Sequence, residues 1–152
     1  MVVGADGQLP LPWLAAPLAA ALAQQRAHAL LLHGAAGAGA LAFSLTLAQA
    51  WLCESAAPVK PCGRCTACHL VQTHVHPDLL VLLPESMRQP LGWPLRDDKP
   101  EGDGEGAGKR KPSRQIRIDE IRSAIDWIVK TSSRGVAKVL VLHPAEAMNL
   151  QS

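Results

Sequence analysis

Four cysteines are the residues whose type and spacing carry the most definite chemistry. They follow the pattern C-x8-C-x2-C-x2-C, and thiolates two residues apart on a turn can converge on one ion. A fourth thiolate at the end of a helix can complete a tetrahedral set of sulfur ligands. The pattern predicts a structural zinc site whose ligands are Cys53, Cys62, Cys65 and Cys68.

Other uses of these cysteines stay open beside zinc. A ferredoxin-type iron–sulfur cluster needs a Cys-Pro at a fixed spacing, which is missing here. A redox pair in CGRC or CTAC is disfavoured because the further cysteines nearby favour closed coordination. The histidines His69, His74 and His76 are possible substitute ligands, but four thiolates already saturate zinc.

A glycine-rich bend is the second candidate for chemistry. The motif G-x-x-x-x-G-K-[ST] binds phosphate through backbone N–H groups and a lysine, while its hydroxyl holds Mg²⁺. Gly34, Gly37 and Gly39 keep the bend, but Ala40 stands at the lysine position and Leu41 at the hydroxyl position. A charge-assisted contact contributes about 1.5–3 kcal/mol, and phosphoryl transfer also needs the metal. We expect this loop to hold no ATP and to hydrolyse none.

Composition limits the class of protein. The chain has 152 residues, 48% of them hydrophobic, and a formal net charge of +2, which is too mild to indicate nucleic-acid binding by itself. Residues 27–53 carry no charge, but His28, His33, Gln49 and the glycines argue against a membrane span. The N-terminus has no basic n-region of a signal peptide. We therefore expect a cytoplasmic protein whose cysteines are reduced.

The elements that must position these residues alternate between helices and strands. Apolar runs predict strands, and apolar residues at intervals of three and four predict helices. Residues 1–12 are expected to be an unstructured lead-in. Strands are expected at 29–33, 79–83 and 139–142, and helices at 17–26, 41–52 and 118–129. This alternation predicts an α/β protein with a parallel sheet.

Residues 86–114 differ sharply in composition. They include RDDKPEGDGEGAGKRKPS, which has too few apolar groups to offset the entropy of ordering. We expect a disordered insertion there. Its basic end, residues 109–111 with Arg114, could touch a nucleic-acid backbone, but a solvated flexible tip is the favoured interpretation.

Taken together, several motifs resemble the delta-prime subunits of bacterial DNA polymerase III clamp loaders. They are PWL, HALLLHG with its glycine loop, the cysteine pattern, HPD at 76–78 and the segment 116–142. The resemblance implies a P-loop NTPase-like (AAA+) parallel sheet with helices on both faces and an inserted zinc module. It implies a truncated AAA+ domain over 1–152 with the zinc module at 53–73, incomplete at the C-terminus. We expect a fragment or a truncated product.

The same resemblance implies a role in replication. Strand 139–142 would end in the Walker B acids of an active relative, and His143 and Pro144 stand there instead. The implied protein is a non-hydrolysing subunit, not an enzyme by itself, within a DNA-directed DNA polymerase holoenzyme. Its implied partners are the gamma/tau and delta subunits, and through them the sliding clamp and primed DNA, with no membrane.

Two functions of other classes remain as alternatives. An active P-loop ATPase is opposed by Ala40, Leu41, His143 and Pro144. A zinc-ribbon nucleic-acid binder would use Lys60, Arg64 and the basic end of the insertion, and would show a steep salt dependence.

Overall fold

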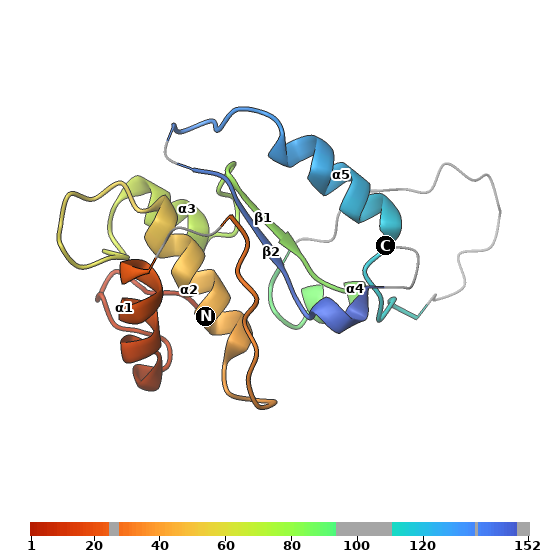
Figure 1. The fold of residues 1–152 in the computed structure, drawn as a ribbon, viewed down its shortest axis with the longest axis horizontal. Helices are drawn as coiled ribbons and strands as arrows, with labels where there is room; N and C mark the ends of the chain where they lie inside the picture. Colours follow the sequence, from red (N-terminus) through yellow and green to blue (C-terminus); the bar gives the residue numbers. More distant parts are fainter. Residues whose placement is uncertain (25–27, 94–110, 136, 149–152) are drawn as a thin grey trace. The chain divides into compact units, whose positions relative to one another are not determined.

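The structure, a computed structural model, describes residues 1–24, 28–93, 111–135 and 137–148. The chain is a mixed α/β protein with a small parallel sheet (Figure 1). It divides into two units. The first contains Met1–Leu80 and Ile128–Val141, and the second contains Val81–Trp127 and Leu142–Ser152.

Helix α2 (Ala40–Leu52) is the centre of the first unit. It has no charged residue, so most of its surface can be buried, including the polar Thr46 and Gln49. Before it come the 3-10 turn η1 (Pro12–Leu14) and helix α1 (Ala15–Ala23), and after it comes α3 (Thr66–Gln72). Both helices pack against α2. One apolar cluster joins α1 and its preceding turn to α2, with the members Leu14, Leu18, Ala42, Phe43 and Leu47.

The sheet consists of β1 (Leu79–Leu82) and β2 (Val139–Leu142), which pair in parallel (Figure 1). The Val139 N–H donates to the Asp78 carbonyl at 2.9 Å, and the His143 N–H donates to the Leu82 carbonyl at 3.0 Å. Parallel strands need a crossover connection, and two helices of the described residues lie between these strands in sequence. Both strands were predicted from their unbroken apolar runs, and both predictions are confirmed.

The second unit contains α4 (Glu85–Arg88), most of α5 (Ile118–Ile128) and the 3-10 turn η2 (Ala145–Ala147). A parallel bridge joins Ile116 to Met148, and Ile116 is fully buried. The first turn of α5 holds two acidic residues, which suits the positive end of the helix dipole.

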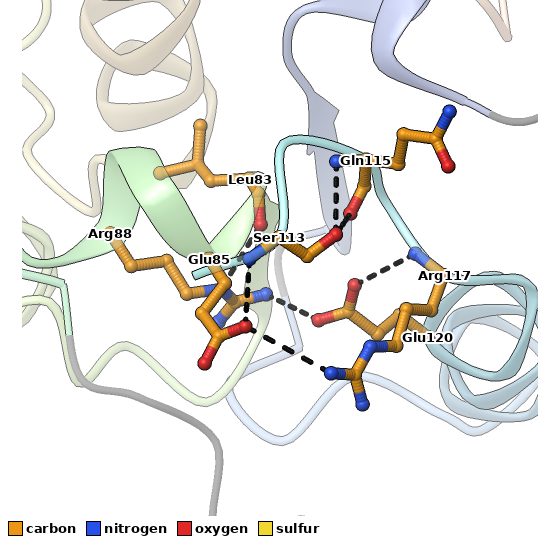
Figure 2. Close-up of polar contacts among 7 residues, drawn as sticks. All are labelled: Leu83, Glu85, Arg88, Ser113, Gln115, Arg117 and Glu120. Atoms are coloured by element: carbon orange, nitrogen blue, oxygen red, sulfur yellow. Dashed lines mark hydrogen bonds and ion pairs between the residues drawn. The ribbon is translucent and has the colours of Figure 1, made fainter. Parts of the chain in front are cut away.

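Polar contacts join α4 to the first turn of α5 and to the segment that precedes it (Figure 2). The Arg88 guanidinium is buried and donates to the Leu83 carbonyl at 3.0 Å and to Glu120 Oε1 at 2.8 Å. Glu85 Oε2 accepts from the Ser113 N–H at 3.0 Å. A buried ion pair is stable only when its hydrogen bonds are satisfied, and here the carbonyl partner helps to satisfy the cation.

The structure differs from the predictions at the segment 29–33. No strand forms there among the described residues, and the side chains of Leu30 and Leu31 are exposed by 51% and 81%. A strand needs a neighbouring strand to satisfy its backbone groups. The described sheet has only β1 and β2, which pair with each other. The strand predicted at 29–33 from its apolar run is therefore wrong.

Two further segments differ in part from the predictions. The lead-in is not loose throughout, because Val3 is buried and its N–H donates to Gln49 Oε1 at 2.9 Å. The predicted insertion 86–114 begins inside α4, whose Arg88 is held by the contacts of Figure 2. Its central part, 94–110, lies outside the described residues, as does the predicted end of the first helix near residue 26. Helix α3 was not predicted.

Candidate metal centre and glycine loop

The four cysteine side chains lie together in the first unit. Their Sγ atoms all lie within 4.8 Å of one another. The Sγ atoms of Cys53 and Cys65 are 3.9 Å apart, as are those of Cys62 and Cys68, and all four cysteines are free. A tetrahedral zinc site with Zn–S bonds of about 2.3 Å places its sulfurs about 3.8 Å apart. The cluster is therefore consistent with a zinc site.

Local backbone structure brings these thiols together. Cys53 is the C-cap of α2, and Cys65 is the N-cap of α3, where its Sγ accepts from the Cys68 N–H at 3.4 Å. Between them the chain turns at Gly63, whose φ of 71° favours glycine. A Cβ at Gly63 would also clash with the Gly4 carbonyl oxygen. The lead-in thus packs directly against the turn that carries the central ligands.

The surroundings of the thiols act differently on their pKa values. Burial raises the pKa of Cys53 and of Cys68. Hydrogen bonds from the backbone N–H groups of Arg64 and Cys65 lower the pKa of Cys62 to about 6. The Cys62 thiolate is therefore the most readily formed of these three, and a metal ion would have to displace protons from the two buried thiols.

A network of hydrogen bonds lies beside the cysteine cluster in the same unit. The Arg134 guanidinium donates to both oxygens of Glu54, at 2.6 and 3.0 Å, and Glu54 follows Cys53. Asp78 is fully buried and accepts from the Ser133 N–H at 2.7 Å and the Arg134 N–H at 2.9 Å. These contacts lower the pKa of Glu54, and they lower the pKa of Asp78 although burial opposes this. The loop before β2 is thus tied to the residue before β1 and to the residue after the first cysteine.

His76 has no place in the cysteine cluster. Its Nδ1 accepts from the Asp78 N–H at 3.0 Å, and burial lowers its pKa. No described histidine belongs to the group of potential metal ligands. Sequence reasoning noted HPD only through the resemblance and missed Glu54 and Arg134. The partners are 80 positions apart, so no local pattern could have joined them.

The glycine loop has two glycines with positive φ and leads directly into the apolar helix α2. Gly37 and Gly39 have φ values of 81° and 92°, and Gly39 is the N-cap of α2. Ala40 begins the helix, and the Leu41 side chain is buried. Leu41, which stands at the position predicted for a magnesium-binding hydroxyl, therefore belongs to the core.

The positions predicted for a degenerate Walker B motif lie in the second unit. His143 follows β2 directly, and its N–H completes the strand pairing with the Leu82 carbonyl. The Pro144 carbonyl accepts from the Ala147 N–H at 3.0 Å and so begins η2. No carboxylate stands at either position. The acidic Glu146 comes later, within the 3-10 turn.

Comparison with known families decides the relationship. Residues 14–152 match the family described as DNA polymerase III, delta subunit. The chain belongs to this family. Related chains carry the name DNA polymerase III subunit delta'. The one from Pseudomonas aeruginosa is 35% identical over 128 residues, covering 84% of this chain and 31% of the relative. The one from Haemophilus influenzae is 38% identical over 121 residues, covering 80% and 29%.

A third relative, from Yersinia pestis, is 29% identical over 141 residues, covering 90% of this chain and 34% of its own length. The chain thus spans about a third of the length of these curated relatives. The membership confirms the resemblance to delta-prime subunits drawn from the sequence motifs. In the part of the chain that the structure describes, no helix combines the length and apolar character needed to cross a membrane.

Proposed function

We propose that this chain is the N-terminal AAA+ part of a clamp-loader subunit that acts in DNA replication without hydrolysing ATP. The observation that carries the proposal is the pairing of a four-thiol cluster with a glycine loop whose lysine and hydroxyl positions are Ala40 and Leu41. Family membership supports it over residues 14–152. The described strands would belong to a larger AAA+ sheet with helices on both faces.

The proposed role is that of a rigid protein partner. A residue that supplies neither cation nor metal ligand cannot stabilise a transferring phosphoryl group, so sister subunits would supply ATP hydrolysis. The partners would be the gamma/tau and delta subunits, acting together on the sliding clamp and primed DNA in the cytoplasm. In this arrangement the chain contributes shape and contact surface to a polymerase holoenzyme.

Zinc would serve structure in this proposal. When bound, it would join four thiolates from the end of α2, the following turn and α3 into one closed centre. The module would span 53–73 and fix α3 and the Gly63 turn to the end of α2. The segment 86–114 remains a proposed insertion in the domain that covers 1–152.

The test replaces the matched third of the Pseudomonas aeruginosa relative with this chain. The chimera is combined with that organism's delta, gamma/tau and clamp subunits, and clamp loading on primed DNA is measured. We expect assembly and loading, with ATP hydrolysis that depends on the gamma/tau subunits. Assembly without loading would contradict the proposal. Magnesium-dependent ATP binding at micromolar concentration by this chain alone, measured by titration calorimetry, would favour the ATPase alternative.

A further inference from the structure

Two glycines of the loop share the sign of φ but differ in their neighbours. Gly37 and Gly39 both have positive φ, at 81° and 92°. A Cβ built on Gly37 meets nothing within 4 Å, whereas a Cβ on Gly39 would clash with Cδ1 of Leu11. Glycines of phosphate loops let a ligand approach the backbone closely. At Gly39 the close neighbour is a leucine of the same chain.

The segment that brings Leu11 to the loop makes a second contact there. The indole Nε1 of Trp13 donates to the Ala38 carbonyl at 3.3 Å, one residue before Gly39. The Leu14 N–H donates to the Leu11 carbonyl at 3.0 Å, which closes the turn that carries both side chains. One hydrogen bond and one apolar contact therefore hold this turn on the loop.

The turn is also anchored in the core. Leu14 is buried in the cluster that joins α1 to α2, and Leu11 packs against this cluster. Moving Leu11 away from Gly39 would expose apolar surface, which costs about 25 cal/mol for each Å². The contact is thus a built part of the first unit, and it lies entirely within that unit.

We propose that Leu11 and Trp13 form an apolar cap that closes the glycine loop to phosphate. The cap acts in addition to the missing lysine and hydroxyl, and it would exclude phosphate even if both were restored. Gly39 then serves packing rather than ligand binding. This inference deepens the proposed absence of ATP by adding a steric cause that lies 28 positions away from Gly39 in the sequence.

The first test restores the phosphate motif with and without the cap. ATP binding with Mg²⁺ is measured by titration calorimetry for the 152-residue chain carrying Ala40→Lys with Leu41→Thr, and again with Leu11→Ala added. We expect at least tenfold tighter binding when Leu11 is truncated. The matched control adds Leu9→Ala instead, because Leu9 packs on the same cluster and should give no gain. Equal binding with and without Leu11→Ala, including no binding in either, overturns the cap.

A second test uses unfolding and needs no nucleotide. Gly37→Ala reports the cost of positive φ alone, whereas Gly39→Ala reports that cost plus the clash with Leu11. We expect Gly39→Ala to lower the urea midpoint more than Gly37→Ala, and this difference to disappear in a Leu11→Ala background. A difference that persists in that background overturns the proposal.

The two proposals fail in different ways. ATP binding by the unchanged chain would contradict the proposed function, whatever Leu11 does. The cap is decided only by comparing variants that differ at Leu11, so a loader subunit without a cap remains a distinct outcome.

Discussion

Helix α2 connects two regions that differ in what their residues can do. It begins at the glycine loop and ends at Cys53 of the thiol cluster. At the first end, a loop with two glycines of positive φ leads into Ala40 and Leu41. At the second end, four side chains with metal-binding chemistry lie within 4.8 Å of one another. The comparison shows that a glycine-rich bend does not by itself identify a phosphate site. Packing against Leu11 is another reason why residue 39 is a glycine.

The largest expected effect concerns the metal. We expect purified chain to hold one zinc ion, and Cys65→Ser to lose it, because serine offers no thiolate. Structural zinc contributes on the order of 10 kcal/mol to folding in small zinc domains. Loss of the ion should therefore unfold the turn around Gly63 and α3, while the glycine-loop end of α2 keeps its own core. Mass spectrometry for metal content and amide exchange along the chain would measure both effects.

His69→Ala is the matched control for the cysteine change. His69 is exposed on α3, one residue beyond Cys68, and lies outside the thiol cluster. We expect its zinc content to equal that of the unchanged chain. Iron in the purified protein would contradict the zinc assignment and favour an iron–sulfur cluster. A disulfide in place of metal would contradict it too and favour a redox pair.

A smaller loss of stability is expected when the hydrogen-bond network beside the cysteine cluster is changed. Asp78→Asn replaces one carboxylate oxygen by an amide donor that faces a backbone N–H, so the loop 132–135 loses a partner. A hydrogen bond to a charged group contributes about 1.5–3 kcal/mol, and we expect a loss of about that size in urea unfolding. Asp119→Asn is a fair control, because the Asp119 side chain is 81% exposed. An equal loss of stability in both variants would show that the hydrogen bonds to Asp78 do not stabilise the fold.

The same two ends show what the sequence could and could not predict. The thiol cluster was predictable because C-x2-C spacing acts over a few residues and needs no distant partner. The helices and strands that flank it follow from local periodicity, and β1, β2, α2 and α5 lie close to their predicted positions. The strand at 29–33 failed because strand formation depends on a neighbour rather than on apolar content.

Contacts across long stretches of sequence account for the remaining differences. The cap residue Leu11 lies 28 positions from Gly39, and Arg134 lies 80 positions from Glu54. Val3 was expected in a loose lead-in, yet Gln49 binds both its N–H and its carbonyl at 2.9 Å. No pattern within a few residues encodes such pairs, since each depends on how the whole unit packs.

A change at Gln49 is expected to affect the cysteine end of α2 and to leave its glycine-loop end unchanged. Its amide also donates to the Cys68 carbonyl at 3.4 Å, so it faces the thiol cluster. Gln49→Leu leaves the buried Val3 N–H without this acceptor, which costs about 1–3 kcal/mol. We expect lower stability and faster zinc loss to a chelator, with the Gly39 and Leu11 contact unchanged. Gln72→Leu should cost less, because Gln72 accepts no hydrogen bond from Val3 N and lies nearer the surface.

The smallest effect is a dependence on pH. Burial lowers the pKa of His76, so the folded chain keeps this imidazole neutral while the unfolded chain takes up a proton below about pH 6.5. Stability from this group is present above that pH and falls as the pH drops toward the lower folded pKa.

His76→Asn keeps an acceptor for the Asp78 N–H and cannot titrate. The urea midpoint of this variant should therefore fall less between pH 6.5 and 5 than that of the unchanged chain. Identical slopes for His76→Asn and the unchanged chain would contradict the titration assigned to His76. Asp78 contributes only at lower pH, because its lowered pKa leaves its stabilisation intact until the pH falls below about 4. The two groups near β1 thus respond in separate pH ranges, whereas the capped glycine loop, which has no titrating side chain from Gly34 to Leu41, should contribute to neither.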